Sequence, residues 1–125
     1  MPKVVPVPPS QSTLRSYGLT AEAWLAMAER QGYVCPVCQK PFGERKLVID
    51  HEHVKGWKAR KSKLKSGKRR ANKDVRVMTP EERRPHVRGI LHAWCNGFVR
   101  SWLTLPRARS IVAYLEVHEE RKADA

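Results

Sequence analysis

Two short metal-ligand motifs constrain the fold of this chain more than any other feature. The motif Cys35-Pro-Val-Cys38 has the two-residue spacing that lets two sulfur atoms reach one tetrahedral metal, and His92-Ala-Trp-Cys95 repeats that spacing with a mixed pair. Together the two motifs use every cysteine of the chain. They predict a zinc ion with four protein ligands, which leaves no open position for water and so stabilises the fold rather than catalysing a reaction.

Alternatives to this zinc site remain open from the sequence. A lone Cys-x-x-Cys motif also fits a redox pair, and His92 also fits an ordinary histidine of the surface or the core. His118 is the rival fourth ligand, although it has no matching spacing. Residues 39–91, 53 in all, separate the two pairs, against roughly 12 to 20 in common zinc knuckles. A four-ligand site therefore predicts a long insertion between its halves.

The size and charge of the chain predict one domain that binds a polyanion. Its 125 residues have room for a single domain, which we place at residues 13–121. The 25 Lys and Arg against 12 Asp and Glu give a net charge of +13 and a pI near 10.2. So large an excess favours nucleic acid as the partner over a surface that is basic only for solubility.

The sequence also predicts the compartment. No apolar run approaches the roughly 20 residues of a membrane span, and residues 1–10 lack the apolar block of a signal peptide. We therefore expect no membrane contact and a cytoplasmic protein. Cytoplasmic thiols stay reduced, so an odd number of cysteines favours metal ligation over a disulfide framework.

The chain begins with a proline-rich stretch followed by a helix. Residues 1–12 carry four prolines among small and polar residues, which predicts a disordered N-terminal arm outside the fold. Thr20 is a suitable N-cap for a helix of about three turns that Gly32 is placed to end. Apolar residues at helical spacing predict its buried face: Trp24, Leu25 and Ala28.

Two strands and two further helices follow. Apolar runs predict strands at 47–49 and 87–91, and the segment 92–103 is interpreted as a short helix. Pro106 suits the first turn of a last helix that runs to residue 121, and residues 122–125 should fray. Four apolar residues lie on or near one face of this last helix: Ala108, Ile111, Val112 and Leu115.

Asp50-His51-Glu52-His53 ends the first strand, and Asn96 directly follows the last presumed zinc ligand. The order of a helix, Cys-x-x-Cys, a strand ending in Asp-His-x-His, a Val-Arg-Gly strand and Cys-Asn resembles the recombination endonuclease VII family of phage HNH nucleases. The resemblance covers roughly residues 17–56 and 87–105.

The resemblance implies a role for each matching residue. It implies that His51 is the general base, that Asp50 and Asn96 coordinate a divalent cation, and that the Cys and His motifs hold zinc. The chain departs from the family pattern at two positions. His92 stands where members usually have Cys, and Val99 stands where the archetype has Glu.

Elementary chemistry agrees with these roles. A neutral imidazole can take a proton from water near pH 7, and a carboxylate with an amide oxygen suits Mg²⁺ or Mn²⁺. We expect Asn96 at a helix N-terminus, with backbone N–H groups toward the phosphate. Neighbours in a regular strand face opposite ways, so the strand must bend between Asp50 and His51. His53 either binds the phosphate or assists the leaving group, or it is a surface histidine.

A strongly basic segment, residues 57–85, separates the two strands. It carries 12 Lys or Arg against three acids, a net charge of +9, and residues 75–78 could form a short extra strand. Alone it would be a solvated loop, whereas beside a phosphodiesterase site it becomes a clamp for the DNA backbone without sequence recognition. The expected DNA contacts are Lys58, Arg60, Lys61, Lys63, Lys65, Lys68, Arg69 and Arg70 of this insertion, together with Arg88 of the second strand.

These observations lead to one expected architecture and function. We expect an α+β fold with a ββα-metal core (HNH, also called His-Me finger) and a structural zinc knuckle, flanked by N- and C-terminal helices. The expected function is a metal-dependent DNA endonuclease that nicks or cleaves duplex or branched DNA in a bacterial or phage-infected cell. Holliday-junction resolution would need two cuts and hence a homodimer. The rivals are a zinc-knuckle DNA-binding protein without catalysis, and a ribonuclease or colicin-like toxin.

Overall fold

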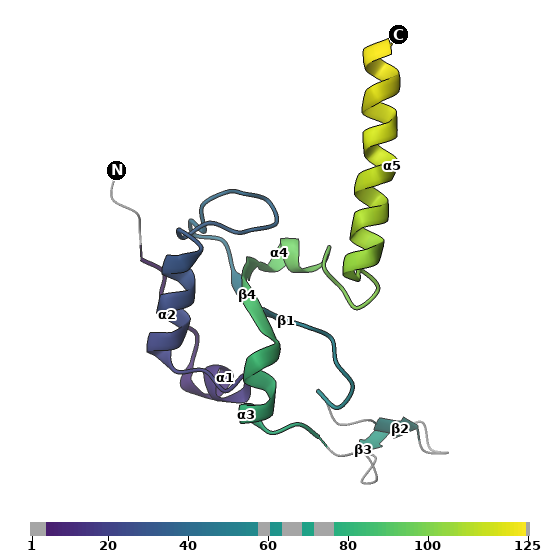
Figure 1. Cartoon of the computed structure of the whole chain (residues 1–125). Helices are drawn as coiled ribbons and strands as arrows, with labels where there is room; N and C mark the ends of the chain where they lie inside the picture. Colours follow the sequence, from purple (N-terminus) through teal and green to yellow (C-terminus); the bar gives the residue numbers. More distant parts are fainter. Residues whose placement is uncertain (1–4, 58–60, 64–68, 72–76, 125) are drawn as a thin grey trace.

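The computed structural model describes residues 5–57, 61–63, 69–71 and 77–124. Its central element is a two-stranded antiparallel sheet of β1 (Leu47–His51) and β4 (Val87–His92). Figure 1 shows helix α2 (Ala21–Arg30) beside this sheet and helix α5 (Leu105–Asp124) extending away from it. The mixture of helices and antiparallel strands makes the fold α+β, as predicted.

Within residues 5–12 the chain has more regular structure than the disordered arm expected over residues 1–12. Helix α1 (Gln11–Ser16) already begins inside that range, because the Ser10 hydroxyl accepts a hydrogen bond from the Thr13 N–H and caps it. Leu14 of this helix is buried in the core. An apolar residue one turn after a serine cap was the signal for this helix, and the nearby prolines concealed it.

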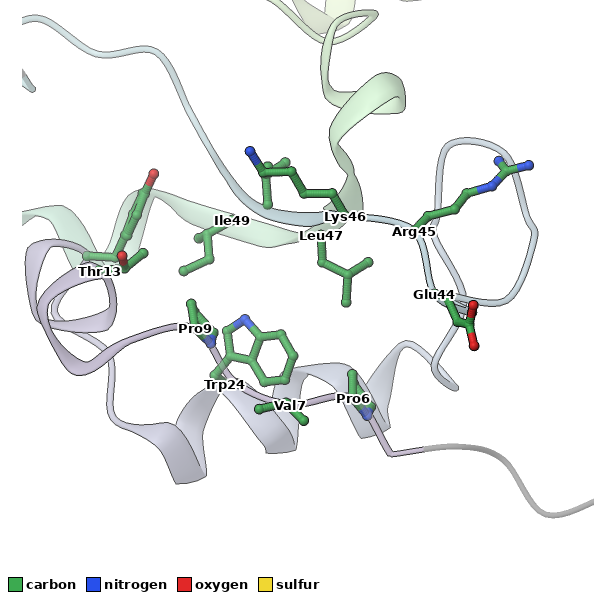
Figure 2. A pocket seen from close by; sticks show the side chains of 13 residues that line it. Pro6, Val7, Pro9, Thr13, Trp24, Glu44, Arg45, Lys46, Leu47 and Ile49 are labelled. Atoms are coloured by element: carbon green, nitrogen blue, oxygen red, sulfur yellow. The ribbon is translucent and has the colours of Figure 1, made fainter.

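Residues before α1 border a cavity of about 490 Å³. Trp24, Leu47 and Ile49 point into it from α2 and β1 (Figure 2). The side of the cavity formed by the N-terminal segment consists of Pro6, Val7 and Pro9. Pro6 and Pro9 therefore lie against the domain.

Helix α2 supplies much of the core. Thr20 caps it by accepting from the Ala23 N–H, and Gly32 follows its end with a left-handed φ of 67°. Of the predicted buried face, Trp24 and Ala28 are buried but Leu25 is only half-buried. The core of the described residues contains Leu14, Trp24, Met27, Ala28, Phe42, Ile49, Ile90 and Leu91 with Cys35 and Cys95.

The strands β1 and β4 pair in a register that ends in a bulge. The Cα partners are Leu47–His92, Val48–Leu91, Ile49–Ile90, Asp50–Gly89 and His51–Val87. The register shifts by one residue between the last two pairs, which makes Arg88 the extra residue. A β-bulge bends the strand and raises its local twist. The register thus shifts at the step from Asp50 to His51, where the first strand was predicted to bend, but the extra residue belongs to β4 and the bend of β1 stays a prediction.

Gln31 joins α2 to the sheet. Its side-chain Nε2–H donates to the Ile90 carbonyl at 2.8 Å, and its Oε1 accepts from the Ile90 N–H at 2.8 Å. A Cβ at Gly89 would lie 2.7 Å from the same Oε1 atom. A side chain at this position would therefore displace the end of the Gln31 side chain from its bonds to Ile90.

The segment predicted as a basic insertion contains regular structure. Strands β2 (Lys61–Lys63) and β3 (Arg69–Ala71) form an antiparallel pair, and helix α3 (Pro80–Arg83) leads through the 3-10 turn η1 (Arg84–His86) into β4. Thr79 and Glu82 form a capping box at the start of α3. Of the expected extra strand at 75–78, residues 75 and 76 lie outside the described residues, and Val77 and Met78 are not in a strand.

The C-terminal third differs from the prediction in helix length. Helix α4 (Ala93–Asn96) is a single turn, so the continuous helix expected over 92–103 is wrong. Beyond it the chain continues in turns, with the Val99 N–H donating to the Asn96 carbonyl, and Gly97 in the middle of this stretch disfavours a helix. Helix α5 begins next to Pro106 and continues to Asp124, past the expected end at residue 121. None of the described helices is both long and apolar enough to cross a membrane.

Candidate active site and metal centre

The four presumed metal ligands meet between the cysteine turn and the end of β4. The ligand atoms of Cys35, Cys38, His92 and Cys95 all lie within 4.8 Å of one another. The cysteine turn is closed by the Cys35 N–H, which donates to the Lys40 carbonyl at 2.9 Å. Three thiols and an imidazole are a typical donor set for tetrahedral zinc, so this cluster is a candidate structural zinc site.

The hydrogen bonds of His92 select which ring nitrogen can bind a metal. His92 is 1% exposed, and its Nε2 lies 3.0 Å from the Phe42 carbonyl oxygen, which can only accept. Nε2 therefore carries the proton, and Nδ1, 3.3 Å from the Cys38 sulfur, is left as the ligand atom. A backbone carbonyl commonly orients a metal-binding histidine in this way.

The thiols of the cluster affect one another. Burial raises the pKa of Cys35, but hydrogen bonds from the backbone of Cys38, His92 and Val37 outweigh it, and the pKa falls to about 7. Burial and the neighbouring sulfurs of Cys38 and Cys35 raise the pKa of Cys95 to about 11. One thiolate thus forms readily and opposes the next, and a divalent cation would offset that repulsion. The donor set therefore fits zinc in its charge as well as its geometry.

Asp50 is nearly buried, at 6% exposed, and is held by Arg88. The Arg88 Nε donates to Oδ2 at 2.7 Å and Nη2 donates to Oδ1 at 3.0 Å, a bidentate ion pair. Nη2 also donates to the Val99 carbonyl at 3.3 Å. Arg88 therefore ties the end of β1 to the turn that follows α4.

The imidazole of His51 lies in an aromatic cluster. It stacks on Trp57 with 3.8 Å between ring centroids and 7° between planes, while Tyr17 and His53 lie at 5.9 Å and 5.1 Å in tilted arrangements. His51, His53 and Trp57 border an open hollow of about 290 Å³ that Val54 and Gly56 complete. A half-buried imidazole at such a hollow can meet both water and a substrate.

A second pair of polar side chains, Glu52 and His86, lies just beyond β1. His86 Nδ1 lies 2.9 Å from Glu52 Oε1, and the Glu52 N–H donates to the His86 carbonyl at 2.8 Å. This contact was not predicted from the sequence. It extends the pairing of the two strands past the bulge.

Comparison with known proteins identifies the family. The recombination endonuclease VII family matches residues 10–117 of the chain. The chain belongs to this family. It is also 31% identical, over 90 residues, to the Gene 59 protein of Mycobacterium phage D29. That match covers 71% of this chain and 37% of the phage protein, so the chain spans little more than a third of that relative's length. No solved structure matches the chain.

Asn96, which matches the family's Cys-Asn motif, is placed differently from the prediction. It is the last residue of the single-turn helix α4 rather than the first residue of a longer helix. The expected approach of helix N-terminal N–H groups to a phosphate at Asn96 is therefore wrong. Its carbonyl instead accepts from the Val99 N–H at 3.2 Å, in the turn that Arg88 joins to Asp50.

Both departures from the endonuclease VII pattern have local explanations. His92 keeps a ligand atom at the cluster through Nδ1. Val99, where the family archetype has Glu, is half-buried and packs against the core. Its side chain cannot bind a cation, and its carbonyl serves Arg88 instead.

Few of the expected DNA contacts can be located. Lys58, Arg60, Lys65 and Lys68 lie outside the described residues. Four others lie on the backbone of β2 and β3: Lys61, Lys63, Arg69 and Arg70. Arg88 has an exposed side chain, at 41%, but is paired with Asp50. Of the expected ligands, His118 lies on α5 and is not part of the metal cluster.

Sequence reasoning missed the residues that surround His51. Trp57 was grouped with the basic insertion, yet it is 8% exposed and stacks on the imidazole. Arg83, also grouped there, donates to the Trp57 carbonyl at 2.6 Å and to the Ser16 carbonyl at 2.9 Å. The sequence signal for Trp57 was a single tryptophan beside a long polar segment, because a tryptophan is usually largely buried against other side chains.

Proposed function

We propose that the chain is a metal-dependent DNA endonuclease of the HNH type, which hydrolyses phosphodiester bonds. In this proposal β1, β4 and the turn of α4 form a ββα-metal core, and the four-ligand cluster holds a structural zinc ion beside it. The observation that carries the proposal is the bulge opposite the step from Asp50 to His51, where a buried carboxylate and a half-buried imidazole follow one another at the end of the sheet. Membership of the endonuclease VII family supports DNA as the substrate.

His51 is the general base in this mechanism. Its imidazole accepts a proton from the attacking water, the water oxygen bonds to phosphorus, and the bond from phosphorus to one bridging oxygen breaks. His53, whose ring lies 5.1 Å from that of His51, binds the phosphate or gives a proton to the leaving oxygen.

Asp50 and Asn96 are the residues that would hold the catalytic cation. An ionised carboxylate offers about four lone-pair sites, so the two bonds from Arg88 leave room for a metal at Asp50. Hard oxygen ligands favour Mg²⁺ or Mn²⁺, which when bound neutralises charge that develops on the phosphate. Arg88 holds the carboxylate still and, through Nη1, is available to a phosphate oxygen.

The basic segment supplies affinity in this proposal. We propose residues 13–121 as one nuclease domain, with the insertion at 57–85 and Arg88 contacting the DNA backbone. Contacts to phosphate give affinity without sequence recognition. As a phage-type nuclease it would act in the cytoplasm of the host cell. Residues 1–12 and 122–125 lie outside the catalytic machinery.

Branched DNA is the preferred substrate within this class. The family description refers to recombination, which supports a junction-resolving activity. Resolving a four-way junction needs two cuts, and a homodimer would supply two sites. Helix α5 offers a surface for it, because three of its apolar residues are exposed at 41–54%: Ile111, Val112 and Leu115.

A cleavage assay tests the proposal. The protein should be incubated with Mg²⁺ and duplex, single-stranded, four-way-junction DNA or RNA of matched length, beside its His51→Ala variant. We expect cleavage of DNA, greatest for the junction, and none by the variant. Binding without cleavage in every condition would favour the second candidate, a zinc-knuckle DNA-binding protein, which the net charge of +13 and the metal cluster alone would allow. Preferential cleavage of RNA would favour a ribonuclease.

A further inference from the structure

We propose that Trp57 is a positioning residue that holds the His51 imidazole in the orientation needed to accept a proton from water. The inference rests on the proposed function, because it takes His51 to be the general base. In this inference Trp57 acts through His51 and takes no proton itself.

The contact between the two rings is the first argument. Their centroids lie 3.8 Å apart and their planes differ by 7°, the most nearly parallel ring pair described in this structure. The torsion angle of a histidine ring about its Cβ–Cγ bond has only broad preferred ranges, so the covalent geometry of the side chain does not fix the ring plane by itself. A parallel partner restricts that rotation, because turning the imidazole would drive its edge into the indole. Trp57 thus restricts the plane in which the ring nitrogens of His51 lie.

The second argument is that Trp57 is itself fixed. The Arg83 guanidinium donates to the Trp57 carbonyl and, through its other terminal nitrogen, to the Ser16 carbonyl at the end of α1. Its Cζ atom also lies 5.3 Å from the centroid of the indole, a cation–π contact. Tyr17 packs on Trp57 at 5.8 Å. A single arginine thereby joins α1, α3 and Trp57 behind the imidazole.

The third argument is the composition of the segment. Trp57 is buried although it directly precedes the most basic stretch of the chain. The stack therefore links the segment proposed to grip DNA with the residue proposed to perform the chemistry. Misplacing a catalytic group by about 1 Å can lower a rate about 100-fold, so a loose imidazole should be costly.

The experiment compares Trp57→Leu, which removes the aromatic face, with Trp57→Phe, which keeps one. Cleavage of a synthetic four-way DNA junction is measured with Mg²⁺ for kcat and KM, together with the thermal midpoint and zinc content. We expect kcat to fall about 10- to 100-fold in Trp57→Leu with KM, zinc content and fold retained, and to recover largely in Trp57→Phe. Trp102→Leu is the matched control, because Trp102 is exposed and contacts Arg107 rather than His51.

Nuclear magnetic resonance supplies a readout that does not depend on activity. The ring protons of His51, assigned with a His51→Gln variant, should be shifted upfield by the indole in the wild-type protein. They should move downfield in Trp57→Leu and much less in Trp57→Phe. If Trp57→Leu does not fold, Arg83→Lys replaces it, since lysine keeps the charge but not the fork that reaches both carbonyls. It should give the same downfield movement and a smaller loss of kcat.

Three results separate the failures. A wild-type kcat for Trp57→Leu, or for Arg83→Lys where it is used, beside an inactive His51→Ala protein would overturn the positioning role and leave the proposed function intact. Unchanged His51 resonances in the same variant would overturn it as well. An active His51→Ala protein would refute His51 as the base, and the inference with it.

Discussion

Replacing Cys38 by serine tests zinc ligation with little disturbance of packing. Cys35 and Cys95 are buried in the core, whereas Cys38 is only half-buried. Serine is similar in shape to cysteine, but its hydroxyl is a poor ligand for zinc. The loss of stability in Cys38→Ser therefore measures the metal rather than the removal of core volume.

The expected effect is large relative to the stability of a domain. Structural zinc contributes about 10–16 kcal/mol of apparent binding free energy in small zinc domains, while whole domains are stable by only about 5–15 kcal/mol. Losing one of the four ligands should therefore leave the chain largely unfolded at 25 °C. His92→Cys is the matched control, because it keeps four ligands. It loses only the Nε2–H bond to the Phe42 carbonyl and some packing, about 1–3 kcal/mol.

Elemental analysis and thermal unfolding followed by circular dichroism provide the assay. The wild-type protein should contain one zinc per chain, and its thermal unfolding transition should disappear in a strong chelator. The Cys38→Ser protein should show no unfolding transition even without the chelator. His92→Cys should keep its zinc with a midpoint a few degrees lower. A zinc-free wild-type protein that unfolds cooperatively, or a Cys38→Ser protein with the wild-type midpoint, would refute the reasoning.

Four further predictions concern function. His51→Ala should abolish cleavage while DNA binding in a gel-shift assay stays nearly unchanged, because a base acts only in the chemical step; undiminished cleavage would assign the base elsewhere, with His53 the first candidate. Asp50→Ala and Asn96→Ala should each raise the Mg²⁺ concentration needed for half-maximal cleavage, and an unchanged Mg²⁺ response would remove them as ligands. Leu115→Glu should convert a dimer into a monomer in light scattering without lowering the helix content, and a wild-type protein that is monomeric alone and on junction DNA would contradict the dimer. The last prediction replaces six basic residues of the insertion by serine: Lys61, Lys63, Lys65, Lys68, Arg69 and Arg70. The slope of log affinity against log salt should flatten by about 0.9 for each duplex phosphate that the protein no longer neutralises, with zinc content unchanged. An unaltered slope would make the insertion a solvated loop.

Features with local chemical signatures could be predicted from the sequence. The Thr20 cap, the strands at 47–49 and 87–91 and the meeting of the two ligand pairs follow from side-chain chemistry at fixed spacing. The length of the helix after β4 could not be predicted, since apolar residues at helical spacing also suit a chain of turns. Gly97 and the packing of Val99 against the core favour turns over a helix in this stretch.

The surroundings of the candidate catalytic residues depend on contacts distant in sequence. Nothing near Asp50 in the sequence indicates that Arg88 will hold its carboxylate, because that pair forms only when the strands adopt their register. Likewise Tyr17, Trp57 and Arg83 come from three separate segments that meet at His51 or beside it. Such residues become visible only in three dimensions.

The position of the bulge follows from contacts on both sides of it. On the α2 side, two hydrogen bonds between Gln31 and the backbone of Ile90 fix Ile90, and a side chain at Gly89 would displace the end of Gln31. On the other side, the Glu52 N–H bonds the His86 carbonyl. The extra residue must then fall between Gly89 and His86, opposite the step from Asp50 to His51. Because these contacts set the register locally, the part of the segment between Trp57 and Met78 can change in length or charge without shifting the pairing of β1 and β4.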